Sequence, residues 1–239
     1  MKNLKFGAGV MATALLLSSC GASNTTKGGL IGGGSGAALG AIIGNIIGKD
    51  AKGTLIGAGI GAAVGTGAGL LIGKIMDKAK AAAEAVDNSQ VETVKDANGL
   101  DAVKVTFDSG ILFKTSSYAL SDAAKQNLND FVNNVLKPYS DCDVAIQGYT
   151  DNQGWRNSTA EQSAQKNVVL SQNRADAVKT HLLLAGAAAS QIKSSTGFGQ
   201  ENPVADNSTK AGQEQNRRVE IYLYASEAMI KAANAGTLK

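Results

Sequence analysis

Three patterns of hydrophobic residues follow one another along the 239-residue chain. A mostly apolar run at residues 6–17 comes directly after two lysines, Lys2 and Lys5. A glycine-rich apolar stretch then occupies residues 28–73, and shorter alternating and helix-like patterns fill the chain from about residue 88 onward. Such changes of period predict three regions that fold in different environments.

The last region alternates between strand-like and helix-like periods. Alternating apolar residues predict strands at 91–94, 103–107, 144–148 and 219–223, with a shorter strand at 194–199. The first two flank Asn98-Gly99, which predicts a two-residue hairpin turn. Apolar residues three and four apart predict one helix from Ser121 to Pro138 and another around residues 170–182. We therefore expect an α+β fold over residues 88–227, with a C-terminal tail at 228–239. It would be a mixed sheet of βαβαβ type with helices on one face, preceded by a β-hairpin.

Glycine recurs at every fourth position in the middle region. The step runs from Gly32 to Gly48, is broken by the polar segment 49–53, and returns from Gly57 to Gly73. On a helix this step forms one stripe where another backbone can approach closely. So much glycine costs a helix in water about 1 kcal/mol per residue, whereas lipid forces the backbone to bond internally. The pattern predicts a helical hairpin over residues 28–76 that enters a bilayer, then a helical linker at 77–87. A disordered linker is the alternative.

The start of the chain is organised like a bacterial export signal. A charged beginning and an apolar centre lead to Leu17-Ser18-Ser19-Cys20. This last segment resembles a lipobox, which implies cleavage after residue 19 and acylation of Cys20. Residues 1–19 would then be the signal peptide and 20–27 a lipidated tether. A two-pass hairpin would return residue 74 to the leaflet that holds the acyl chains. The alternative is a secreted protein with an incidental cysteine.

Composition excludes several classes of function. Without the two lysines of the signal, the 23 basic residues fall to 21 against 20 acidic ones, which gives no electrostatic case for nucleic acid. Once Cys20 is acylated, Cys142 has no disulfide partner, and the single histidine, His181, has no metal-ligand cluster beside it in the sequence. Ser-x-x-Lys patterns at 163–166 and 190–193 come without the Lys-Thr-Gly that accompanies them in penicillin-binding enzymes. We expect no cofactor, no metal and no enzymatic activity.

Four ordered motifs lie at the ends of predicted strands and helices. They are Gly148-Tyr149-Thr150-Asp151, Asn167 followed by Arg174-Ala175, Gly197-Phe198-Gly199, and Asn216-Arg217-Arg218-Val219. Together they resemble the OmpA-like peptidoglycan-binding domain over residues 113–223. The lipobox, the glycine zipper and this domain in one chain resemble the YiaD-type lipoproteins.

The resemblance implies a site for the free end of diaminopimelate in the peptidoglycan stem peptide, which carries an ammonium and a carboxylate on one carbon. Asp151 matches the family position for the ammonium, and Arg174 matches the position whose planar guanidinium takes the carboxylate. Thr150, Asn167 and Arg217 match supporting positions. The implied protein is lipid-anchored in the cell outer membrane, with its C-terminal domain in the periplasm. Its partners would be peptidoglycan, outer-membrane lipid and, through the glycine-zipper helices, further copies of itself.

Four features depart from the family pattern. Tyr149 stands where a histidine is usual, Lys114 where an aspartate is common, and Ser116 where a ligand-contacting asparagine can occur. Residues 153–166, which include Trp155, lengthen the segment between Asp151 and Arg174. These changes bear on which cross-linking amino acid is accepted more than on peptidoglycan binding itself. The competing interpretation is an oligomeric or pore-forming membrane assembly, in which the glycine hairpins carry the function and the C-terminal domain is only a wall tether.

Overall fold

The computed structural model describes residues 67–96 and 98–238. The predicted signal peptide, the lipidation site Cys20 and most of the predicted glycine hairpin lie outside the described residues. Within the described ranges, no helix combines the length and the hydropathy that crossing a bilayer requires.

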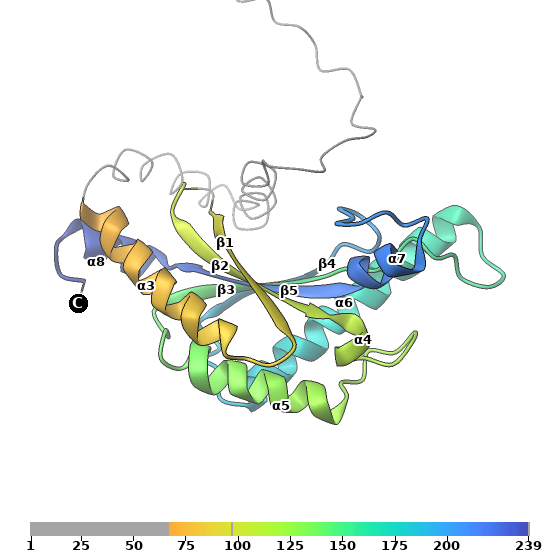
Figure 1. Ribbon diagram of the computed structural model, residues 1–239, viewed down its shortest axis with the longest axis horizontal. Helices are drawn as coiled ribbons and strands as arrows, with labels where there is room; N and C mark the ends of the chain where they lie inside the picture. Colours follow the sequence, from red (N-terminus) through yellow and green to blue (C-terminus); the bar gives the residue numbers. More distant parts are fainter. Residues whose placement is uncertain (1–66, 97, 239) are drawn as a thin grey trace, which may run out of the picture. The chain divides into compact units, whose positions relative to one another are not determined.

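Five strands form one mixed sheet (Figure 1). They are β1 (Ser89–Lys95), β2 (Asp101–Asp108), β3 (Cys142–Gly148), β4 (Ile192–Gly197) and β5 (Arg218–Ala225). Their order across the sheet is β1-β2-β5-β3-β4, and all neighbours are antiparallel except β3 and β4, which are parallel. The last strand of the chain therefore lies at the centre of the sheet. The predicted α+β class with a mixed sheet is confirmed.

The helices of the described chain are mostly gathered on one face of this sheet. They are α3 (Gly67–Glu84), α4 (Ser109–Leu112), α5 (Asp122–Phe131), α6 (Ala160–Leu184), α7 (Lys210–Asn216) and α8 (Glu227–Asn234). A π-helical turn, η1 (Val132–Leu136), continues α5 towards Pro138. Side-chain hydroxyls start the two central helices, because Ser121 accepts from the Ala124 N–H and Thr159 from the Gln162 N–H.

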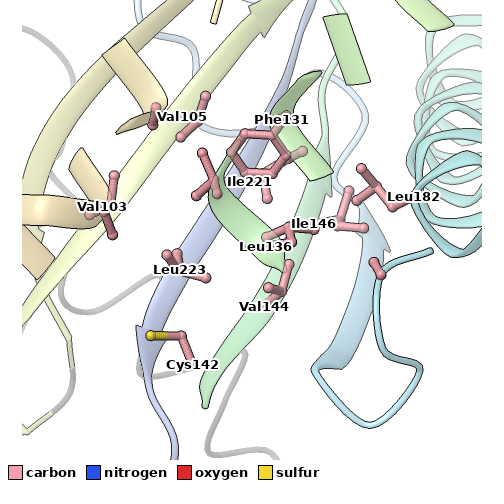
Figure 2. Close-up of a cluster of buried hydrophobic side chains, with 14 of the residues drawn as sticks. Val103, Val105, Phe131, Leu136, Cys142, Val144, Ile146, Leu182, Ile221 and Leu223 are labelled. Atoms are coloured by element: carbon pink, nitrogen blue, oxygen red, sulfur yellow. The ribbon is translucent and has the colours of Figure 1, made fainter. Parts of the chain in front are cut away.

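One hydrophobic core fills the space between the sheet and α3, α5, η1, α6 and α8. Alternate residues of the central strands, such as Ile146 and Ile221, meet Phe131 and Leu182 from the helices (Figure 2). Cys142 belongs to the same core and is 0% exposed. Its burial, with a smaller contribution from the neighbouring aspartates, raises the pKa of the thiol to about 12. This cysteine is therefore a packing residue with an unreactive thiol.

The packed core extends beyond both ends of the region 88–227. Helix α3 buries Ile72 and Met76, and α8 buries Met229 and Ile230 where the sequence predicted a tail. Both helices contribute to the core, and they contact each other. Residues 67–73, which end the glycine series, therefore belong to a helix that packs on the domain.

The two-residue turn predicted at Asn98-Gly99 is wrong. The β1–β2 ladder ends with the pair Lys95 and Asp101, so the connection is longer. The carboxylate of Asp96 accepts hydrogen bonds from the backbone N–H groups of Asn98, at 2.8 Å, and Leu100, at 2.9 Å. An aspartate side chain that accepts hydrogen bonds from the following backbone N–H groups stabilises a turn. At Asp96 this turn replaces the two-residue hairpin turn that the sequence predicted.

Glycine is required where α6 crosses the ends of β3 and β4. A Cβ at Gly148 would lie 2.2 Å from the carbonyl oxygen of Ser171, and one at Gly197 would lie 2.1 Å from the backbone nitrogen of Gln172. Both neighbours are backbone and cannot rotate away. We expect Gly148→Ala to lower the free energy of unfolding by about 3 kcal/mol, at the upper end of overpacking costs, in urea denaturation.

The matched control for this change is Gly73→Ala in α3. There the nearest atom to an added Cβ is Asp101 Oδ2 at 3.5 Å, which is an ordinary contact. Alanine in a helix interior should leave stability unchanged or raise it by up to about 1 kcal/mol. A Gly148→Ala protein as stable as the unaltered chain would show that α6 does not rest on the strand backbone.

Candidate functional site

A cavity of about 760 Å³ opens at the end of the sheet where β3 stops and β5 begins. Helix α4, the segment after it, the loop at 153–156 and α6 complete its wall, and Figure 1 shows these elements at one end of the sheet. All five residues predicted for the site line this cavity: Thr150, Asp151, Asn167, Arg174 and Arg217. The structure thus brings them together, and their contacts with a ligand stay a prediction.

Asp151 lies three residues beyond Gly148, the last ladder residue of β3. The chain is held there by backbone bonds, because the Tyr149 N–H donates to Arg218 O at 2.9 Å and the Thr150 N–H to Gly199 O at 2.8 Å. The carboxylate is buried and accepts hydrogen bonds from Arg217 Nη1, at 2.6 Å, and from the Gln153 N–H, at 3.1 Å. Arg217, predicted as a supporting residue, is therefore the direct ion-pair partner of Asp151.

Arg174 is a buried cation just past the middle of the cavity-facing helix α6. It is 3% exposed, its Nε donates to Ser117 O at 3.0 Å, and its guanidinium lies 5.2 Å from the centre of the Phe113 ring. Among residues 67–96 and 98–238, no carboxylate lies within ion-pair distance of it. Burial lowers the pKa of its guanidinium, the nearby positive charge of Arg217 lowers this pKa further, and Asp151 partly offsets both effects. A bound carboxylate would relieve this unfavourable electrostatic environment.

Asn167 braces the loop that follows Asp151. Its Nδ2 donates to Asp151 O at 3.4 Å and to Gln153 O at 3.3 Å, and its Oδ1 accepts from Trp155 Nε1 at 2.7 Å. The Trp155 N–H also donates to Ser163 Oγ at 3.0 Å. The lengthened segment is therefore clamped onto α6, and its residues 153–156 form part of the cavity wall.

Two further cavity residues were missed from the sequence. Ser109 begins α4, is 2% exposed, and its hydroxyl has no hydrogen-bond partner within the described structure. Arg156 is an exposed residue of the clamped loop. Local pattern marks neither, because one begins a four-residue helix and the other lies in a polar segment. The indole of Trp155 was the one available signal that this segment packs on the domain.

Tyr149, the residue that replaces the usual histidine, lies outside the cavity wall. Its ring stacks on Phe198, with centroids 5.4 Å apart, and the guanidinium of Arg218 lies 3.8 Å from its centroid. Arg218 Nε in turn donates to Glu220 Oε1 at 2.7 Å, and the Tyr222 hydroxyl donates to Glu220 Oε2 at 2.6 Å. Burial, and secondarily the charge of Glu220, raise the pKa of Tyr149. This departure therefore supports the end of β3 from behind the site.

The residues of the two Ser-x-x-Lys patterns make other contacts in this structure. Ser163 Oγ accepts from Trp155, while Lys166 Nζ donates to Ser158 Oγ at 2.8 Å, and Lys193 pairs with Asp143 at 3.3 Å. Within the described chain, no hydrogen bond joins the Ser and Lys of either Ser-x-x-Lys pattern. Nor do the described residues include a group of three or more His, Cys, Asp or Glu side chains that could hold a metal ion.

Comparison with known families agrees with this fold and site. Residues 112–217 match the OmpA family, and residues 1–78 match the YMGG-like Gly-zipper family. The chain therefore carries an OmpA-like domain, preceded by a glycine-zipper sequence, as the motifs predicted.

Individual relatives resemble about half of the chain. It is 39% identical over 123 residues to the probable lipoprotein YiaD of Escherichia coli (strain K12), which is 52% of this chain and 52% of YiaD. It is 37% identical over 120 residues to the peptidoglycan-binding protein ArfA of Mycobacterium tuberculosis (strain H37Rv), which is 50% of this chain and 34% of ArfA. The chain thus spans about half the length of the first relative and a third of the second.

Solved structures share the fold of the domain. The cell wall anchor of the T6SS from Pseudomonas aeruginosa is 26% identical with a TM-score of 0.50, over 63% of this chain and 97% of that one. The periplasmic domain of Helicobacter pylori MotB is 20% identical with a TM-score of 0.51, over 64% and 88% of the two chains. The second likeness concerns the fold alone.

The buried ion pair between Arg218 and Glu220 should contribute strongly to the stability of β5, which directly follows Arg217. Arg218→Met removes the partner of Glu220, whose side chain is 3% exposed. An unpaired buried carboxylate typically costs about 3–5 kcal/mol, which urea denaturation would detect. The additional change Glu220→Gln removes the unpaired buried charge. The double variant should recover at least half of the lost free energy of unfolding. If Arg218→Met alone costs less than about 1 kcal/mol, the pair is solvated and does not hold β5 in place.

Proposed function

We propose that this chain is a non-catalytic lipoprotein that binds peptidoglycan without a covalent bond and tethers the outer membrane to the cell wall. Binding runs through the free end of diaminopimelate in the stem peptide. One observation carries most of the proposal: a single cavity holds a buried carboxylate, Asp151, and a buried guanidinium, Arg174, that has no carboxylate partner among the described residues.

The two side chains have the free bonding positions that a zwitterion needs. Ser117 O accepts from Arg174 Nε, and no other hydrogen bond to a described residue involves this guanidinium. Nη1 and Nη2 can therefore meet a carboxylate side by side. The carboxylate of Asp151 accepts one bond on each oxygen, from Arg217 and Gln153. Because an ionised carboxylate has about four acceptor positions, Asp151 can also accept from an ammonium.

The relatives support wall binding as the coarser part of the proposal. ArfA is named a peptidoglycan-binding protein, the matching Pseudomonas structure is named a cell wall anchor, and YiaD is named a probable lipoprotein. An anchored wall-binding protein needs only a weak site. Two charge-assisted contacts contribute about 1.5–3 kcal/mol each before the cost of association. Tethering next to a polymer with many identical sites then supplies a high effective concentration.

The wall site can be tested with Asp151→Ala. Loss of the carboxylate removes the acceptor for the ammonium, so co-sedimentation with purified sacculi should be abolished while the far-ultraviolet circular dichroism stays unchanged. Arg174→Lys, which keeps the charge but not the fork, should weaken sedimentation about tenfold. The control is Asp130→Ala, an exposed aspartate of α5 outside the cavity. Full sedimentation of the Asp151→Ala protein would refute the assignment of the site.

The membrane anchor can be tested with Cys20→Ala. Without acylation the protein should move from the outer-membrane fraction to the periplasmic fraction, because the loss of several acyl chains removes about 0.8 kcal/mol per buried methylene. Cys142→Ala, which removes the core cysteine, is the control and should stay in the membrane fraction. Continued membrane recovery of the Cys20→Ala protein would show that the glycine hairpin inserts unaided. Liposome conductance would then test the alternative of a pore-forming assembly.

A further inference from the structure

The cavity holds far more positive than negative charge. Among the described residues that line it, the cations are Lys114, Arg156, Arg174 and Arg217, and the one carboxylate is Asp151. Asp151 is already paired with Arg217 at 2.6 Å. A zwitterionic end brings one charge of each sign, so its binding leaves the excess of positive charge unchanged. Complementarity therefore requires a ligand with further negative charge.

Lys114 and Arg156 are the two cations that a zwitterionic end leaves unused. Within residues 67–96 and 98–238, neither side chain makes an ion pair or a hydrogen bond, and both are exposed where they line the cavity. Their backbones are nevertheless fixed. The Ser117 N–H donates to Lys114 O at 3.0 Å, and Arg156 follows Trp155, which is bonded to Ser163 and Asn167. The two charges are thus held at the cavity without a protein partner.

The size of the cavity points to the same conclusion. Its volume of about 760 Å³ lies within the range of roughly 300–1,000 Å³ that is usual for sites enclosing a whole small ligand. The end of one amino acid fills only part of it. The segment after α4 and the 153–156 loop, which carry Lys114 and Arg156, also line this cavity.

We propose that Lys114 and Arg156 bind a second ionised carboxylate of the stem peptide, that of the glutamate next to diaminopimelate. The chain then distinguishes stem peptides in which this carboxylate is free from those in which it is amidated. This inference rests on the proposed function, because it extends the same site along the same ligand.

Two synthetic tripeptides test the proposal with the full chain in detergent. Both are alanyl-γ-glutamyl-diaminopimelate, with the glutamate carboxylate either free or amidated, and binding is measured by titration calorimetry at low ionic strength. We expect the free form to bind about tenfold more tightly, the order expected for two solvent-accessible charge pairs. In the double variant Lys114→Gln/Arg156→Gln, the two forms should bind within twofold of each other.

A second double variant controls for net charge. Lys78→Gln/Lys210→Gln removes two exposed cations outside the cavity and should keep the tenfold preference. Equal binding of the two tripeptides to the unaltered chain would overturn this inference and leave the proposed function intact. A preference that survives in Lys114→Gln/Arg156→Gln would also overturn it, because another group would then recognise the carboxylate. Binding of neither tripeptide would refute the proposed function together with the inference.

Discussion

The site depends on the direct contact between helix α6 and the backbones of β3 and β4. Gly148 and Gly197 have no side chain, so the helix rests on the strand ends at Ser171 and Gln172. Hydrogen bonds fix this crossing, because the Gly197 N–H donates to Gln172 Oε1 and the Gly199 N–H to Ser171 Oγ, both at 2.8 Å. Asn167 and Arg174 lie four residues before and three residues after Ser171, on the same side of the helix. Because α6 packs so closely on the strand ends, Asn167 and Arg174 lie beside the end of β3, and Asp151 follows that strand end.

This arrangement explains which parts of the structure could be predicted from the sequence. Strand alternation and helical spacing are local, so they located β3, β5, α5 and α6, and the motifs at their ends marked Asp151 and Arg174. Strand order, the packing of α3 and the ion pair between Asp151 and Arg217 join residues far apart in the chain, and no local pattern encodes them. The hairpin prediction failed for a different reason, since the side chain of Asp96 offered a competing set of hydrogen bonds.

The central strand β5 also shows that a local pattern does not predict burial. Every residue of β5 is buried, although alternate positions of the strand are polar. Arg218, Glu220 and Tyr222 satisfy one another there by hydrogen bonds, and Tyr149 adds its ring to Arg218. A buried polar group is tolerated only with its partners in place. This network therefore fixes the relative position of the two strands, β3 and β5, whose ends carry Asp151 and Arg217.

A prearranged cavity of this kind would, on the proposed function, favour zwitterions over simple anions. In the folded protein Arg174 is already buried near the positive charge of Arg217. This environment is unfavourable for its charge, and it lowers the pKa of Arg174. A carboxylate that arrives at Arg174 relieves this cost, but a simple anion makes no use of Asp151. An ammonium on the same carbon as the carboxylate does, because it adds a second cation to a carboxylate that already holds Arg217. In the proposed binding mode, a ligand carboxylate at Arg174 and a ligand ammonium at Asp151 would therefore favour each other's binding, and selectivity would come from their fixed separation.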